Sequence, residues 1–295
     1  MAASAKPAPP ARLRALLEKP GLHVMPCCFD ALSAQLIERA GFALTFMSGF
    51  AVSAARIGAP DTQLISYGEM VDQGRNICAA VEIPVIGDAD TGYGNAVNVR
   101  RTVAGYAQAG FACAMIEDQV APKRCGHTRG KQVVGRGEAL ARIRAAVDAR
   151  AEGRDILVMA RTDARFGHGL DEALWRARAF ADLGADLIFV EAPQSEAELE
   201  RVAREVPAPC MVNLVEEGDT PILPHARLES MGYRIAAYPL TLLSSAARAM
   251  QDALAALREG KTPERRLAFP ELRALVGFDA YDALSRRYAA EEDPD

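Results

Sequence analysis

The chain has 295 residues, of which 50% are hydrophobic and 25% carry a charge, and its formal net charge at pH 7 is −5. This composition is ordinary for a globular protein, and the acidic balance gives no reason to expect nucleic acid or an anionic membrane surface as a partner. No apolar run in the sequence approaches the roughly 20 residues that a membrane-spanning helix needs.

The first ten residues, MAASAKPAPP, are rich in alanine and proline and lack an apolar signal core. We therefore expect a flexible leader over residues 1–12, followed by a single domain over residues 13–295. The six cysteines fall mostly inside hydrophobic segments and show no C-x-x-C spacing. A disulfide framework or a zinc site is not expected, and a reducing cytoplasm fits this pattern.

Short apolar runs alternate with helical patterns along the chain. Eight runs predict strands, at residues 23–28, 43–49, 84–90, 112–119, 156–163, 187–193, 209–216 and 234–240. Each run is apolar throughout and often β-branched, which is typical of a parallel strand that is buried on both faces. Helices are predicted between them, for example over residues 137–151, 171–183 and 195–206.

Four of these units share a join between a helix and the next strand. The joins read ERAGFALTF, AQAGFACAM, ADLGADLIF and ESMGYRIAA, and their glycines are Gly41, Gly110, Gly184 and Gly232. In each, the glycine ends a helix and a strand begins two or three residues later. Glycine suits this place because it adopts the left-handed conformation without a Cβ clash.

Eight strand–helix units in roughly 240 residues predict a (β/α)8 barrel, whose usual size is about 250 residues. The alternative, a doubly wound open sheet, normally has a glycine-rich turn after its first strand, and PCCFDALSA contains no glycine. After Gly260 the sequence predicts a helical C-terminal extension over about residues 261–292. This extension is outside the barrel wall, so we expect it to pack on a neighbouring subunit or to cap one end.

Polar residues stand where several of the predicted strands end. They are Ser48 with Gly49, Asp88 and Asp90, Glu117 with Asp118, Arg161 and Asp163, Glu191, and Asn213. In a (β/α)8 barrel the carboxyl ends of the strands form one mouth, and barrel enzymes have their active sites there. Any one of these residues could instead cap a helix or satisfy a backbone group, but together they indicate a site.

Asp88, Asp90 and Glu117 are the most informative of them. Residues i and i+2 of a strand face the same way, so Asp88 and Asp90 would crowd two carboxylates together, with Glu117 arriving from the adjacent strand. A divalent cation would relieve the repulsion, and Mg²⁺ fits, with Mn²⁺ as a possible substitute. The alternative is that these carboxylates pair with Arg161 and other basic residues.

One cysteine lies in a basic loop after the fourth strand, in the stretch APKRCGHTRGKQ. Positive charge lowers the pKa of a thiol, so Lys123, Arg124 and His127 would make Cys125 a better proton donor and acceptor. A loop in this place can also act as a lid that excludes water. Cys125 is therefore a candidate catalytic residue, and the alternative is an incidental loop cysteine.

These residues carry a family resemblance. The stretches GDADTGYGNAVNVRRTV, IEDQVAPKRCGHTRGKQVV, ARTDA, FVEAP and YPL resemble the isocitrate lyase/phosphoenolpyruvate mutase superfamily, from about residue 20 to beyond residue 280. Lyase members carry a K-[KR]-C-G-H motif, which residues 123–127 match. The sequence is most similar to the branch that contains 2,3-dimethylmalate lyase, petal death protein and oxaloacetate hydrolase.

The resemblance implies a barrel whose C-terminal helices are swapped between partners in a homotetramer. It also implies Mg²⁺ at the mouth, held by Asp88 and, partly through waters, by Asp90, Glu117 and Asp61. The implied substrate-binding residues are Ser48, Gly49, Phe50, Asp88, Lys123, Gly126, His127, Arg161, Glu191 and Asn213. The implied catalytic residues are Cys125, Arg161, His127 and Glu117.

Three positions depart from the methylisocitrate lyases of this superfamily. Phe46 replaces a tyrosine, Val215 replaces a threonine, and Ser244 follows YPL where those enzymes carry an arginine. A buried carboxylate without its cation is costly, so these changes predict a substrate with fewer carboxylates and more alkyl surface.

The resulting hypothesis is a Mg²⁺-dependent carbon–carbon lyase of carboxylic acid metabolism that cleaves a 2-hydroxy dicarboxylate of the 2-alkylmalate type, such as 2,3-dimethylmalate. The alternatives are oxaloacetate hydrolysis, methylisocitrate cleavage, carboxyphosphonoenolpyruvate mutase chemistry, and a catalytically inactive barrel that binds a metabolite or partner.

Overall fold

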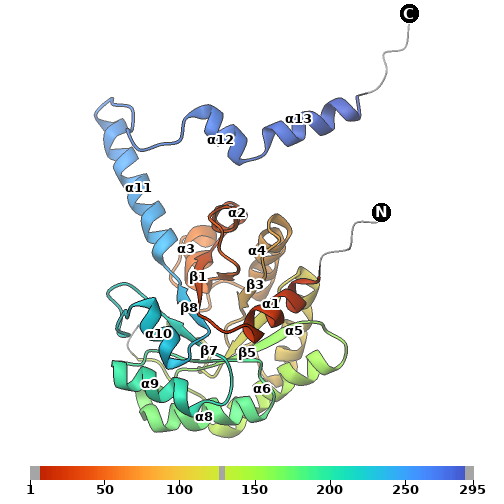
Figure 1. Ribbon diagram of the computed structural model, residues 1–295, viewed down its shortest axis with the longest axis vertical. Helices are drawn as coiled ribbons and strands as arrows, with labels where there is room; N and C mark the ends of the chain where they lie inside the picture. The colour runs from red at the N-terminus through yellow and green to blue at the C-terminus, as the bar shows by residue number, and fades with distance from the viewer. Residues whose placement is uncertain (1–6, 126–129, 290–295) are drawn as a thin grey trace, which may run out of the picture. The chain divides into compact units, whose positions relative to one another are not determined.

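The computed structural model describes residues 7–125 and 130–289, and it contains a closed barrel of eight parallel strands (Figure 1). The strands are β1 (His23–Cys28), β2 (Thr45–Met47), β3 (Val85–Asp88), β4 (Cys113–Glu117), β5 (Leu157–Thr162), β6 (Leu187–Val190), β7 (Cys210–Asn213) and β8 (Ile235–Tyr238). Their spatial order follows the chain, and β8 pairs with β1 to close the barrel. The predicted (β/α)8 barrel is confirmed.

Helices connect the strands, and a chain of helices follows the barrel. They are α1 (Pro9–Glu18), α2 (Ala31–Arg39), α3 (Gly49–Ile57), α4 (Tyr67–Ala80), α5 (Ala96–Ala109), α6 (Arg136–Ala151), α7 (Ala164–His168), α8 (Leu170–Asp182), α9 (Glu196–Glu205), α10 (His225–Met231), α11 (Thr241–Arg258), α12 (Phe269–Leu275) and α13 (Phe278–Arg287). The chain divides into two compact units, Met1–Leu243 and Ser244–Asp295. None of the helices within residues 7–125 and 130–289 is long and apolar enough to cross a membrane.

Residues 9–12, which the sequence assigned to a flexible leader, belong instead to α1. Proline fits the first positions of a helix, where its missing N–H has no helical partner to lose. Leu13 and Leu17 are buried, and they join the cluster of side chains that fills the barrel interior. The apolar face of α1 therefore belongs to the core of the barrel.

The predicted helix–strand joins are confirmed at all four glycines. Gly110 ends α5 with φ 98° and Gly232 ends α10 with φ 106°, both in the left-handed region. Gly41 and Gly184 also have positive φ, of 87° and 95°, directly after α2 and α8. These joins return the chain from each helix to the start of the next strand.

The eight strands are present where they were predicted, but most are shorter than the apolar runs. The sequence predicts a strand over residues 84–90, for example, and β3 ends at Asp88. Some polar residues of the runs lie at or near the ends of the strands, and others lie just beyond them. The first group is Asp88, Glu117, Arg161 and Asn213, and the second is Ser48, Asp90, Asp118, Asp163 and Glu191.

Close packing behind β3 helps to position Asp88. The rings of Tyr106 and Phe111 stack with their centroids 4.6 Å apart. A Cβ atom on Gly87 would lie 2.7 Å from both rings, so only glycine lets the strand approach them this closely. The Tyr106 hydroxyl donates a hydrogen bond of 2.6 Å to the backbone oxygen of Asp88, which ties the end of β3 to this aromatic pair.

Candidate active site

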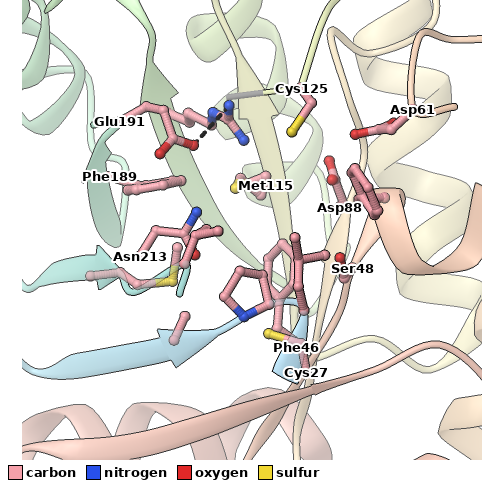
Figure 2. A pocket seen from close by; sticks show the side chains of 17 residues that line it. Cys27, Phe46, Ser48, Asp61, Asp88, Met115, Cys125, Phe189, Glu191 and Asn213 are labelled. Carbon is pink, nitrogen blue, oxygen red and sulfur yellow. Dashed lines mark ion pairs between the residues drawn. The ribbon is translucent and has the colours of Figure 1, made fainter. Parts of the chain in front are cut away.

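A pocket opens at the carboxyl ends of the strands and holds about 590 Å³ of empty space, part of it open to solvent. Eight of the predicted site residues line it: Ser48, Phe50, Asp61, Asp88, Cys125, Arg161, Glu191 and Asn213. Figure 2 shows that six of them reach the pocket from different sides, namely Ser48, Asp61, Asp88, Cys125, Glu191 and Asn213. The structure thus brings together residues that are far apart in the sequence.

The other predicted site residues lie outside the pocket wall or outside the described residues. Asp90, Glu117 and Lys123 are buried and do not line the pocket. Gly49 opens α3, and its backbone N–H donates to Asp88 Oδ2 at 3.2 Å. Gly126 and His127, to which the sequence assigns substrate-binding and catalytic roles, lie outside the described residues.

Asp88 and Asp90 are close together, but not for the reason that the sequence indicated. Because β3 ends at Asp88 and Asp90 has a left-handed φ of 48°, strand alternation does not extend to Asp90. Instead the chain turns back, and the backbone N–H of Asp90 donates to Asp88 Oδ1 at 3.0 Å. The turn leaves Asp88 in the pocket wall and places Asp90 in the interior.

Lys123 joins two of the acidic residues. Its buried ammonium lies 2.6 Å from Asp61 Oδ2 and 3.0 Å from Asp90 Oδ1. Lys123 therefore directs its charge toward the carboxylates, whereas the sequence suggested that it would act mainly on the neighbouring thiol.

Arg161 is held by three carboxylates. Its Nε lies 2.8 Å from Asp163 Oδ2 and 3.3 Å from Glu117 Oε2, and its Nη2 lies 2.9 Å from Glu191 Oε2. Lys131 supports this arrangement from the other side, with its Nζ 3.1 Å from Asp163 Oδ1. The alternative interpretation of Asp88, Asp90 and Glu117, in which they pair with basic side chains, thus describes Glu117, which lies beside Arg161, and Asp90, which lies beside Lys123.

The described part of the site is nevertheless short of positive charge. Six buried carboxyl groups, those of Asp61, Asp88, Asp90, Glu117, Asp163 and Glu191, accompany three buried cations, Lys123, Lys131 and Arg161. Burial, together with the charges of Asp88 and Asp61, raises the pKa of Asp90 from 3.8 to about 7, against the opposing effect of Lys123. Burial likewise raises the pKa of Glu117, in spite of Arg161 and Lys123.

Several oxygens of these carboxylates also lack a hydrogen-bond partner. Within the described residues, five buried oxygens have no hydrogen-bond partner: Asp61 Oδ1 and both carboxylate oxygens of Asp90 and of Glu117. Lys123 lies beside Asp90 and Arg161 beside Glu117, but these contacts are ion pairs without hydrogen-bond geometry. In the part of the chain that the structure describes, no three His, Cys, Asp or Glu side chains converge closely enough to bind one ion directly. This arrangement fits Mg²⁺, which accepts one or two carboxylates and keeps several of its waters, because those waters could donate to the unpaired oxygens.

Cys125 is half-buried and lines the same pocket. Figure 2 shows its sulfur on the side of the pocket where Asp61 and Asp88 lie. A proton donor in this place can reach a substrate that is bound beside these carboxylates.

The rest of the pocket lining is an apolar wall, which the sequence analysis missed except for Phe46 and Val215. It is formed by Phe46, Met115, Phe189, Met211, Val215 and Leu240, together with Cys27, Ala237 and Pro239. In Figure 2, Phe46 and Cys27 lie away from Glu191 and Cys125. The pocket therefore offers charged groups to one end of a ligand and apolar surface to the other.

The chain is similar to known proteins along most of its length. Residues 13–258 match the family described as phosphoenolpyruvate phosphomutase. The 2,3-dimethylmalate lyase of Eubacterium barkeri is 42% identical over 283 residues, which cover 95% of this chain and 98% of that enzyme. An oxaloacetate acetylhydrolase solved with the inhibitor 3,3-difluorooxalacetate has a TM-score of 0.92 and 33% identity, covering 97% of this chain and 99% of that one. A phosphonopyruvate hydrolase solved with oxalate and Mg²⁺ has a TM-score of 0.85 and 30% identity, covering 96% and 99%.

Proposed function

Because the chain belongs to the isocitrate lyase/phosphoenolpyruvate mutase superfamily, we propose that it is a Mg²⁺-dependent carbon–carbon lyase. Its substrate is a 2-hydroxy dicarboxylate of the 2-alkylmalate type, such as 2,3-dimethylmalate, and its products are a 2-keto acid and a carboxylate. The observation that carries this proposal is the division of one pocket into a charged part and an apolar wall.

The apolar wall supports an alkylated substrate. Among the described residues that line the pocket, Arg161 is the only basic one, and it is already paired with Glu191, Asp163 and Glu117. A further substrate carboxylate placed against Phe46 and Val215 would be buried without a partner, which is costly. A methyl group in the same place would gain from burial, by about 0.8 kcal/mol per buried carbon.

The metal would be held by Asp88, with Asp61, Asp90 and Glu117 accepting from its waters. Bound there, Mg²⁺ would polarise the substrate oxygens and lower the pKa of the C2 hydroxyl. Mn²⁺ is a possible substitute, since it favours the same oxygen ligands.

The protein's own groups would then bind and orient the substrate. A substrate carboxylate fits at the start of α3, where Ser48, Gly49 and Phe50 present the positive end of the helix. Arg161 and the amide of Asn213 provide further donors, and Glu191 fixes the orientation of Arg161.

Cys125 would act as the general acid. When the C2 hydroxyl loses its proton and the C2–C3 bond breaks, C2 becomes the carbonyl carbon of the keto acid and the bonding electrons remain on C3. The Cys125 thiol donates its proton to C3, and the thiolate regains a proton from solvent after product release. The base that accepts the hydroxyl proton is unassigned, because Phe46 occupies the place of a tyrosine.

Substrate profiling tests the proposal. We expect 2,3-dimethylmalate to be cleaved with a kcat/KM at least about tenfold above those of oxaloacetate and 2-methylisocitrate, since one misplaced polar or alkyl group changes transition-state binding by about that factor or more. Proton NMR identifies the products of each reaction. Preferred hydrolysis of oxaloacetate would indicate the activity for which the structural relative is named. A product of carboxyphosphonoenolpyruvate with a new phosphorus–carbon bond, seen by phosphorus NMR, would indicate a mutase.

We further propose that the chain forms a homotetramer in which residues 13–295 act as one domain and the C-terminal helices are exchanged between subunits. No residue of α11, α12 or α13 is buried. Large apolar side chains are exposed along them, including Met250, Leu254, Leu257, Phe269, Leu272, Tyr281, Leu284 and Tyr288. Such a surface is typical of a contact between proteins.

Light scattering after gel filtration tests this assembly. We expect a mass about four times that of the 31.6 kDa chain. The double variant Phe269→Ser, Tyr281→Ser should form smaller species, because each side chain is about 70% exposed in the single chain and would be buried only by a partner. Arg266→Ser, at another exposed position, serves as the control. A monomeric wild type would contradict the proposal.

We also propose a cytoplasmic location. All six cysteines of the chain are free thiols. Free thiols persist in a reducing compartment, which supports this assignment.

A further inference from the structure

A glutamine holds the main chain directly before Cys125. The side chain of Gln119 donates from Nε2 to the backbone oxygen of Arg124 at 2.9 Å, and its Oε1 accepts from the backbone N–H of Arg124 at 3.0 Å. A single side-chain amide, which can both donate and accept, thus satisfies both backbone groups of the residue that precedes the thiol. Gln119 is 1% exposed, so neither bond competes with bulk water.

A second glutamine, Gln63, holds the backbone of Lys123, the residue before Arg124. The Oε1 of Gln63 accepts from the backbone N–H of Lys123 at 3.0 Å, and its Nε2 donates to Thr91 Oγ1 at 2.8 Å. Lys123 is held at its other end by Asp61 and Asp90.

Both glutamines are themselves fixed. The backbone of Gln119 pairs with Val133 in an antiparallel bridge, and its oxygen accepts from Arg142 Nη1 at 2.7 Å. Gln63 has a left-handed φ of 57°, a conformation that a non-glycine residue keeps only where its surroundings hold it. The two residues before Cys125 are therefore attached to the barrel through side chains that cannot easily move.

We propose that Gln119 and Gln63 are positioning residues for Cys125, because they fix the two preceding backbone units and thereby aim the thiol into the pocket. The inference rests on the proposed role of Cys125 as general acid. A proton donor must lie within hydrogen-bond reach of the atom that it protonates, and a displacement of about 1 Å can lower the rate by about 10²-fold. Fixing the backbone at residues 123 and 124 sets this distance before substrate arrives.

The first test needs no substrate. The variant Gln119→Met keeps the size of the side chain but cannot form either hydrogen bond to Arg124. We expect iodoacetamide to alkylate Cys125 at least about threefold faster in this variant at a fixed pH, because the half-buried thiol is released toward solvent. Mass spectrometry of the Cys125 peptide measures the rate. An unchanged rate would overturn the proposal.

The matched control is Gln132→Met, which changes an exposed glutamine near the other end of the same loop. We expect its alkylation rate to equal that of the wild type. If Gln119→Met fails to fold, Gln63→Met replaces it. We expect the same increase in the alkylation rate of Cys125, and an unchanged rate would again overturn the proposal. Thermal unfolding of each variant shows whether it is folded.

A double-mutant cycle then tests the connection to catalysis. We expect Gln119→Met to lower kcat by about tenfold or more with KM changed less than about threefold. In a Cys125→Ser background the same substitution should lower kcat by no more than about twofold, since a residue that acts through the thiol has nothing left to position. An equal loss in both backgrounds would overturn the proposal. A wild type without lyase activity would refute the proposed function, while the alkylation rates would still decide the positioning role.

Discussion

Replacing Cys125 with serine is expected to lower kcat for 2,3-dimethylmalate by about 10²-fold or more, the usual scale for the loss of a general acid. Serine keeps the shape of the side chain, but its hydroxyl is a much weaker acid than a thiol. Cys125 lies on the same side of the pocket as Asp61 and Asp88, so a substrate bound at these carboxylates would be within its reach. Steady-state kinetics of the purified variant, with product formation followed by proton NMR, measures the effect.

Cys78→Ser is the matched control for this substitution. Cys78 is also a half-buried free thiol, but it does not line the pocket. Burial raises the pKa of the Cys78 thiol, which makes it a weaker acid, and its place outside the pocket keeps it from the substrate. We expect its kcat to remain within about twofold of the wild type. Near-full activity of Cys125→Ser would exclude the thiol as the proton donor.

The barrel could be predicted from the sequence because its signals are local. Each strand is a short apolar run, and four of the joins carry a glycine whose positive φ the structure confirms, such as Gly110 and Gly232. These features depend only on neighbouring residues and on the burial of both faces of a parallel sheet. The ends of the strands were less predictable, since an apolar run such as residues 84–90 does not show where backbone pairing stops.

The apolar wall of the pocket could also have been found in the sequence. Phe46, Met115, Phe189 and Met211 each lie two residues before a polar residue at a strand end, namely Ser48, Glu117, Glu191 and Asn213. Alternate residues of a strand face the same side, so an inward polar residue implies an inward residue two positions earlier. All four apolar residues belong to the cluster inside the barrel, as this rule requires.

The ion pairs of the site were not predictable, because they join distant parts of the chain. Lys123 pairs with Asp61, 62 positions away, although its nearest charged neighbours in the sequence suggested a role beside the thiol. Lys131 pairs with Asp163, 32 positions away, and thereby supports Arg161. Which of several carboxylates a lysine reaches depends on how the loops cross the barrel mouth, and no local pattern records that.

Replacing Asp88 with asparagine is expected to weaken Mg²⁺ binding by at least about tenfold, with a corresponding loss of turnover at limiting metal. Among the four acidic residues proposed for the metal, Asp88 and Asp61 line the pocket, and Asp61 already binds Lys123. Asp88 is thus the carboxylate that is best placed to contact an ion directly. The substitution removes one of the six buried carboxyl groups of the site, which three buried cations accompany.

Calorimetric titration with Mg²⁺ measures the affinity without any substrate. The dependence of the melting temperature on Mg²⁺ gives a second measure, since a ligand that binds only the folded state stabilises it more at a given concentration when it binds more tightly. Asp171→Asn serves as the control, because this side chain is 88% exposed and pairs only at the surface with Arg201.

The asparagine at position 88 could also disturb the neighbouring backbone, and the two effects are separable. Asp88 accepts from the backbone N–H groups of Gly49 and Asp90, and an asparagine can accept through only one of its side-chain atoms. Losing one of these bonds would lower the stability of the metal-free protein by about 1 kcal/mol. That loss appears as a lower melting temperature without Mg²⁺, whereas the loss of metal binding appears as a smaller increase when Mg²⁺ is added. An unchanged Mg²⁺ affinity in Asp88→Asn would show that the ion, if it binds, is held by other residues.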